Sequence, residues 1–234
     1  MVRMRLIFEK QWLHLLCLGF LLAGLVSVDS RAGSGTGHLF GIATQVWYWL
    51  AAGIAVFHQT YVWFFWRTQL HASLPTRVLG RHAFHTYAAG FALIGIARVV
   101  VVFLLAISNQ GTLSAEPTVL KAMAVVAMVP AFYLFYSVIR YFGAYRAFGI
   151  DHFDARYRSI PFVKKGIFRF TNNGMYIYGF FILWVPALWW SSHAALYIAL
   201  FNHCYIWVHY FATEQPDIKR IYAVEQKTGN SGQV

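Results

Sequence analysis

Residues Ala83–Ile107 read AFHTYAAGFALIGIARVVVVFLLAI, an apolar run of 25 residues whose single formal charge is Arg98. A helix needs about 20 predominantly apolar residues to cross the hydrocarbon core of a bilayer, so this run predicts a transmembrane helix. Five other apolar runs have a similar character, and together they predict an all-α polytopic membrane bundle of about six transmembrane helices. The predicted spans are Trp12–Val28, Leu39–Trp66, Ala83–Ile107, Thr118–Ile139, Met175–Trp190 and Ala194–Ala212.

The composition of the whole chain agrees with a membrane protein. Its 234 residues are 59% hydrophobic and only 12% charged, whereas a soluble domain carries about 25% charged residues. This shortage of charge excludes a disordered tail protein and disfavours a soluble enzyme of the ordinary kind. Cys17 and Cys204 both lie in apolar runs and predict neither a disulfide framework nor a cysteine-based metal site.

The basic residues predict the orientation of the bundle. An even number of spans places both termini on one side, and sixteen of the nineteen Lys and Arg residues then fall on that side. The positive-inside rule makes this side cytoplasmic. The net charge of +11 is also a property of nucleic-acid-binding proteins, but its placement favours an orientation signal. We therefore expect the bilayer, and no nucleic acid, as the partner.

The first span has two interpretations. Its basic start and the small residues of Ser30–Ala32 are compatible with a signal peptide, whereas the length of the run favours an uncleaved anchor. The sequence does not distinguish a multi-pass protein of the endoplasmic reticulum from one of a bacterial inner membrane.

Arg98 is the one charged residue well inside a predicted span. An arginine at this depth either pairs within the bundle or marks a functional site. No predicted span contains an acid to pair with it, which leaves backbone carbonyls or a polar cavity as its partners. We favour a role in stabilising the bundle over contact with a substrate.

Histidines are numerous, but their spacing predicts neither a metal centre nor a haem. His82 and His85 share one face of a predicted helix end, yet the further HxxxH and HxxHH clusters of membrane di-iron enzymes are absent. His14, His58 and His203 lie in predicted spans, where interhelical hydrogen bonds are favoured over haem ligation.

The longest polar segment is Arg140–Asn173, and it divides the chain. Loops of this length in a compact protein are usually functional or carry structure of their own, although a loop that only fixes topology is the alternative. The predicted organisation is a four-span membrane region, residues 1–139, followed by a region over residues 140–234 that contains this loop, a two-span hairpin and a tail.

Two polar stretches flank the predicted hairpin and meet at its cytoplasmic mouth. Asn173 and Tyr176 precede it, and Glu214 and Asp217 follow it. Both ends of a helical hairpin lie on the same side of the membrane, so residues 173 and 214 come together although they are 41 positions apart. Glu214 is either a solvated acid at a helix end or a ligand for a cationic small molecule.

The order and spacing of these motifs resemble the phosphatidylethanolamine N-methyltransferases, a family related to the isoprenylcysteine carboxyl methyltransferases. The resemblance covers about residues 140–223. It rests on Asn172-Asn173-Gly174-Met175-Tyr176, then Glu214-Gln215-Pro216 and Ile221-Tyr222, with Gly143 to Ile150 similar to a glycine-bearing donor segment. Gly174 stands where the family usually has proline, and Gln215 where it has a second glutamate.

The resemblance implies S-adenosylmethionine as methyl donor and the amino headgroup of a phospholipid, phosphatidylethanolamine or its methylated derivatives, as acceptor. Because these motifs lie on the basic side of the predicted bundle, we expect the active site to face the cytoplasm. The residues implied for donor binding are Gly143, Arg146, Gly149, Asn173, Tyr176, Glu214 and Gln215. Arg169, Tyr178 and Trp184 are candidates for binding the acceptor.

The acceptor amine must lose a proton before it attacks, so the reaction needs a general base. The candidates are His152, His209 and Glu214. Two alternatives remain open: a methyltransferase that acts on a prenylcysteine carboxylate or a small thiol, and a non-enzymatic multi-span scaffold or transporter.

Overall fold

The computed structural model describes residues 2–29, 31–33, 35 and 37–230, with side chains placed up to residue 222. Ser30, one of the small residues that are compatible with a signal peptide, lies outside the described residues. Within these ranges the protein is helical, apart from one short hairpin, β1 (His38–Leu39) and β2 (Ile42–Ala43). The α-helices are α1 (Val2–Ile7), α2 (Gln11–Val28), α3 (Thr44–Ala72), α4 (Leu74–Leu79), α5 (Ala83–Ser108), α6 (Pro117–Ser137), α7 (Ala144–Ala147), α8 (Gly174–Tyr178), α9 (Phe181–Trp189), α10 (His193–His209) and α11 (Gln215–Asn230).

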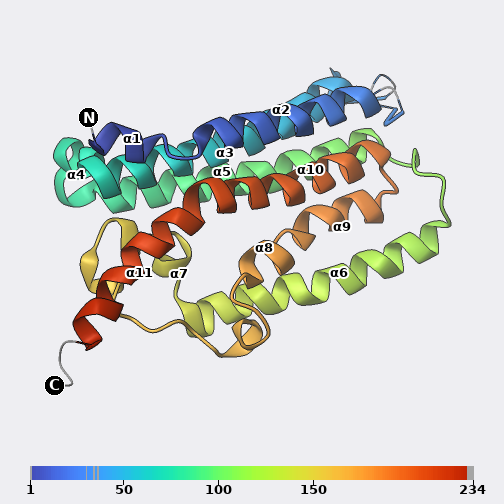
Figure 1. The fold of residues 1–234 in the computed structure, drawn as a ribbon. Helices are drawn as coiled ribbons and strands as arrows, with labels where there is room; N and C mark the ends of the chain where they lie inside the picture. Colours follow the sequence, from blue (N-terminus) through green and yellow to red (C-terminus); the bar gives the residue numbers. More distant parts are fainter. Residues whose placement is uncertain (1, 30, 34, 36, 231–234) are drawn as a thin grey trace.

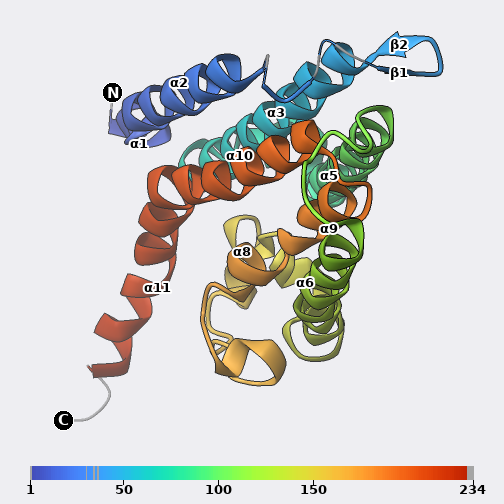
Figure 2. The same cartoon turned by 90° about the vertical axis from the view of Figure 1, so that its right-hand side faces the viewer.

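The long helices form a bundle in which α10 is central. Helices α2, α3 and α5 run beside α10, and α9 packs against α5 and α10 on one side and against α6 on the other (Figure 1). Helix α11 leaves the end of α10 at an angle, and α1 and α11 lie at the same end of the bundle (Figures 1 and 2). Small residues allow the close approach of helices at this centre: Ala51, Ala52 and Ala55 on α3 and Ala195 and Ala199 on α10 are buried.

Three helical stretches are long and apolar enough to cross a membrane by length and composition: Arg3–Val28, Leu74–Ser108 and Pro117–Phe142. They contain the first, third and fourth predicted spans, and they agree with a membrane protein. The count of six and the cytoplasmic side of the termini stay predictions.

The second and fifth predicted spans differ from the observed helices at their ends. Helix α3 begins at Thr44 instead of Leu39, because residues 38–43 form the hairpin. The fifth predicted span is divided into α8 and α9, with a turn at Gly179 and Phe180. A side chain at position 179 would lie 2.5 Å from the carbonyl oxygen of Met175, so glycine permits the tight turn.

Asn109 connects three loops at the end of the bundle away from α11. Its amide nitrogen donates to the carbonyl oxygens of Ala32 and Gly33, both at 3.2 Å. Its amide oxygen accepts from the Thr112 hydroxyl at 2.8 Å, from the Ser192 hydroxyl at 2.9 Å and from the Ala194 backbone N–H at 2.8 Å. Since Asn109 is buried, these five hydrogen bonds hold the loops after α2, α5 and α9 together.

We expect Asn109→Leu to lower the free energy of unfolding by roughly 2–4 kcal/mol, because several buried polar groups lose their partner together. Thermal unfolding in detergent micelles measures the effect. The control is Gln110→Leu at the exposed neighbouring position, which should change little. Equal melting temperatures for the two variants would show that the loops are held by other contacts.

Candidate active site

A cavity of about 250 Å³ lies where the segment around residues 142–176 meets the end of α10 and the start of α11. Aromatic side chains form much of its wall: Trp66, Phe142, Phe162, Tyr176, Tyr210 and Tyr222. Phe162 and Asn172 are exposed to solvent, so the cavity reaches the surface beside them. Six of the predicted site residues line it: Arg146, Gly149, His152, Asn173, Tyr176 and Glu214.

Gly149 brings the backbone close to the floor of the cavity. Its φ of +76° lies in the left-handed region, which glycine adopts readily. A Cβ at this position would lie 2.4 Å from the Trp66 ring. Glycine is therefore required both by the turn and by the packing, and Gly149 lines the cavity.

Arg146 holds one side of the cavity in place. Its guanidinium donates to the carbonyl oxygens of Ile160 and Pro161, both at 3.2 Å, and lies 5.0 Å from the centre of the Phe142 ring. These contacts tie the loop at residues 160–161 to α7. Arg146 thus has a positioning role in addition to facing the cavity.

Glu214 and Tyr176 meet across the cavity mouth. The Tyr176 hydroxyl donates to the Glu214 carboxylate, although the two residues are 38 positions apart. Burial raises the pKa of Glu214 to about 8; the nearby His152 cation opposes this shift, and the Asp151 and Asp217 carboxylates add to it. The predicted meeting of the two ends of the hairpin is therefore present, and Glu214 titrates near neutrality.

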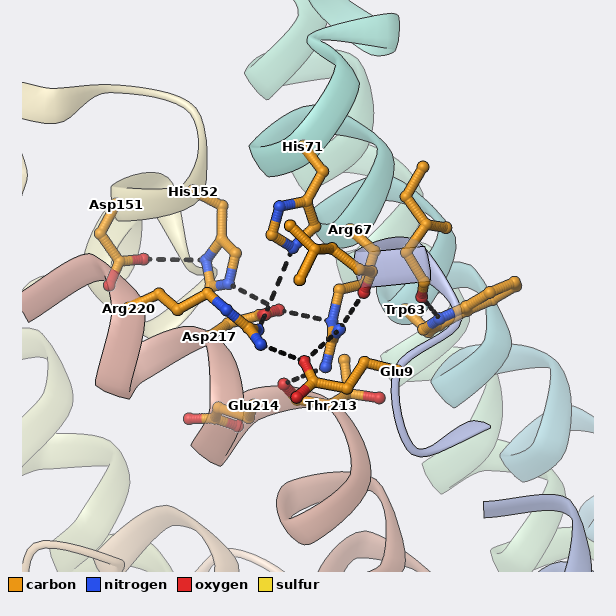
Figure 3. Close-up of polar contacts among 12 residues, drawn as sticks. Glu9, Trp63, Arg67, His71, Asp151, His152, Thr213, Glu214, Asp217 and Arg220 are labelled. Carbon is orange, nitrogen blue, oxygen red and sulfur yellow. Dashed lines mark hydrogen bonds and ion pairs between the residues drawn. The ribbon is translucent and has the colours of Figure 1, made fainter. Parts of the chain in front are cut away.

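Beside the cavity, Asp217 is the centre of an ionic cluster (Figure 3). The fully buried side chains of Asp217 and Arg67 lie 2.9 Å apart. The Asp217 carboxylate also lies 3.6 Å from His152 and from Arg220. Glu9 pairs with Arg220 and lies 3.6 Å from Arg67. Helix α3, the loop before α8, helix α11 and the N-terminal segment are thereby joined at one point.

His152 connects this cluster to the cavity. One ring nitrogen lies 3.1 Å from the Asp151 carboxylate, and the ring stacks on Trp66 with centroids 4.2 Å apart. Burial lowers its basicity, but the Asp151 and Asp217 carboxylates outweigh burial and raise the pKa of His152 to about 9. His152 is therefore a cation at pH 7. Asp151 also accepts from the Tyr222 hydroxyl at 2.9 Å.

Three predicted donor-site or catalytic residues do not line the cavity. His209 is buried in α10 between His14 and Trp66, with ring centroids 6.2 Å away on each side. Gly143 ends the turn after α6 with a φ of +90°, and no atom lies within 4 Å of its Cβ position. Gln215 follows Glu214 directly, but successive helical residues point in different directions, and only Glu214 faces the cavity.

The three predicted acceptor residues also lie elsewhere. Arg169 is exposed and rests on the Phe170 ring at 4.5 Å. Tyr178 packs with Leu134 and Phe168. The Trp184 indole donates to His203 at 3.1 Å within the hairpin. The structure therefore does not bring these three residues to the cavity.

From the sequence, Arg67 was only one of the basic residues that predict the orientation of the bundle, and Trp66 had no predicted role. Trp66 ends the second predicted span and stacks on His152, and Arg67 follows the span directly and pairs with Asp217. The scarcity of acids was the signal that could have found this cluster. Of the eight acids in the chain, four gather here: Glu9, Asp151, Glu214 and Asp217.

Chemically, this arrangement suits a cationic ligand. Aromatic faces attract cations, Glu214 supplies a carboxylate in the same cavity, and Gly149 allows close approach of the backbone. Arg146 offers a positive group for an acidic end of the ligand.

We expect Asp217→Asn to lower the free energy of unfolding by about 3–5 kcal/mol, because it leaves Arg67 as a buried charge without its partner. Thermal or chemical unfolding in micelles measures the change. The control is Asp154→Asn, which removes the carboxylate from the exposed pair with Arg156 and should have little effect. An unchanged melting temperature for Asp217→Asn would refute the structural role of the cluster.

Comparison with known proteins agrees with this chemistry. Residues 119–225 match the family model described as phospholipid methyltransferase. No curated protein and no solved structure gave a significant match to the chain. The matched segment runs from α6 to α11 and contains all six predicted residues that line the cavity, together with Asp217. Residues 119–225 of this chain are therefore similar to the phospholipid methyltransferase family, the family that the sequence motifs predict.

Proposed function

We propose that the protein transfers a methyl group from S-adenosylmethionine to the amino headgroup of a membrane phospholipid, phosphatidylethanolamine or its methylated derivatives. The observation that carries the proposal is the half-buried Glu214 carboxylate in an aromatic cavity, within the segment that matches the phospholipid methyltransferase model. The long apolar helices around this domain support an acceptor that arrives from the bilayer.

The cavity residues fit the donor group by group. Glu214 suits the donor ammonium or its ribose hydroxyls, through charge-assisted hydrogen bonds. The rings of Tyr176 and Tyr210 suit the sulfonium, because aromatic faces stabilise cations. The Gly149 backbone allows the adenosine part to approach closely, and Arg146 suits the donor carboxylate. The volume of the cavity, about 250 Å³, is slightly below the usual range for small-molecule sites, about 300–1,000 Å³.

Glu214 is also the best of the three candidate bases. His209 does not line the cavity, and His152 is already protonated at pH 7 because its pKa is raised to about 9. The pKa of Glu214, about 8, lies near the working pH, where a general base is most effective. The Glu214 carboxylate would accept the proton of the acceptor ammonium, and water at the cavity mouth would carry it away.

S-adenosylmethionine, when bound, supplies a methyl carbon that forms a bond to the amine nitrogen while its bond to sulfur breaks and the sulfur keeps the electron pair. The role of the chain is to hold both reactants in line and to exclude water. Trp66, Tyr176 and Tyr210 serve the second purpose, because they cover the cavity with apolar rings.

The direct test uses purified protein, methyl-labelled S-adenosylmethionine and separate acceptors. We expect label in phosphatidylethanolamine or its monomethyl and dimethyl forms. Label in a prenylcysteine carboxylate or a small thiol instead would move the activity to that acceptor. Donor binding without transfer to any lipid would refute lipid methylation, and no donor binding would favour a scaffold or transporter.

A second prediction concerns pH. Since Glu214 must lose its proton to bind the donor cation and to act as base, donor affinity and kcat/KM should rise about tenfold per pH unit below pH 8 and level off above it. Isothermal titration from pH 6 to 9 measures the affinity. Glu214→Gln should weaken binding and flatten the profile, whereas the exposed Glu116→Gln at the other end of the bundle should keep the wild-type profile. A Glu214→Gln variant with unchanged affinity and pH dependence would show that the site is wrong.

A further inference from the structure

A second cavity, of about 280 Å³, lies directly beside the first. The two share Ala147 and Met175 in their walls. Helices α3, α5, α6 and the α8–α9 pair enclose it, and its lining is apolar except for His58 and Arg98. The region N-terminal to the methyltransferase domain therefore contributes to a cavity next to the candidate active site.

Arg98 is buried at this cavity with part of its hydrogen-bonding capacity unused. Its Nε donates to the Asn202 side chain, and its guanidinium lies 4.9 Å from the centre of the Phe180 ring. One terminal nitrogen has no hydrogen-bond partner. Among the described residues, no carboxylate forms an ion pair with this guanidinium. A buried cation without an anion is costly, so the site favours an anionic ligand.

His58 lies on the same side of the cavity as Arg98. Both of its ring nitrogens are buried without a hydrogen-bond partner. Its ring is 3.6 Å from the Cβ position of Gly95, which is three residues from Arg98 and therefore on the same face of α5. His58 and Arg98 thus offer unused donors to one small region of an otherwise apolar space.

These features describe a site for an amphiphile with an anionic group and an apolar chain. A water-soluble anion would gain nothing from the apolar wall, and an uncharged lipid would leave the guanidinium unpaired. We propose that Arg98 and His58 bind the headgroup phosphate of the acceptor phospholipid, that the apolar wall receives the start of its acyl chains, and that its amine reaches the first cavity past Ala147 and Met175. The amine part rests on the proposed function, but the binding of the lipid anion does not.

The proposal reassigns Arg98. Its position in the sequence favoured a role in stabilising the bundle, but a purely structural arginine would be expected to use its terminal nitrogens within the bundle. The bond to Asn202 orients the guanidinium, and the free nitrogen is available at the cavity.

The test measures lipid binding without catalysis. Native mass spectrometry of the purified protein in detergent would compare phosphatidylethanolamine, phosphatidic acid, diacylglycerol and a prenylcysteine. Phosphatidylethanolamine and phosphatidic acid should bind similarly, and diacylglycerol, which lacks phosphate, at least about tenfold more weakly. Equal binding of diacylglycerol would overturn the proposed phosphate site. Stronger binding of prenylcysteine than of the phosphate-bearing lipids would also overturn it and would indicate a site for a carboxylate.

Two variants locate the site. Arg98→Gln should weaken both phosphate-bearing lipids about tenfold without changing diacylglycerol or S-adenosylmethionine binding; Arg77→Gln, at an exposed position, is its control. Gly95→Leu keeps Arg98 and fills the cavity, so it should weaken all the lipids. Its control is Gly53→Leu, exposed on α3 with no atom within 4 Å of its Cβ position.

The outcomes separate the two proposals. Wild-type lipid binding in both Arg98→Gln and Gly95→Leu overturns the lipid site. If Arg98→Gln fails to fold, as judged by gel filtration and thermal unfolding, Gly95→Leu decides alone. Phosphate-dependent binding that needs Arg98, combined with no methyl transfer to phosphatidylethanolamine, would support the lipid site and refute the proposed function.

Discussion

The ion pair between Asp217 and Arg67 is the contact on which the active-site region depends. Both side chains are fully buried, and removing either would leave a charge in a medium of low polarity, where an unpaired charge is strongly destabilising. The pair joins α11 to α3, and through His152 it also fixes the segment that forms the cavity floor (Figure 3). The cavity therefore exists only where the last helix, the second long helix and the polar loop are held in this one arrangement.

The same cluster determines the protonation states at the cavity. His152 stays charged because two carboxylates face it, although burial opposes the charge. Glu214 interacts electrostatically with these groups, but within the part of the chain that the structure describes it forms no ion pair, so burial raises its pKa. Two titratable groups in one site thus have pKa values displaced above their ordinary range for different reasons. Such displaced values are common where a protein performs proton chemistry.

Both the N-terminal and the C-terminal part of the chain contribute residues to the two cavities. The matched family segment begins at residue 119, but Trp66 and Arg67 from α3 complete the first cavity and its support, and His58 and Arg98 supply the polar groups of the second. The N-terminal helices therefore contribute to the walls of both cavities. The division of the chain at residues 139 and 140 stays a prediction.

The sequence alone determined what depends on local pattern. Long apolar runs predicted the helices, and the order Asn173, Tyr176, Glu214 predicted the family and one side of the cavity, because both ends of a hairpin must return to the same side. It could not place Trp66 beside Gly149, or Arg67 beside Asp217, since these contacts join residues 83 and 150 positions apart in the chain and depend on how helices pack. For the same reason Arg169, Tyr178 and Trp184 were assigned to the acceptor from their nearness in sequence. Only the tertiary structure distinguished residues that face a cavity from those that face the surface, a loop or the core, because burial and direction are properties of the packed bundle.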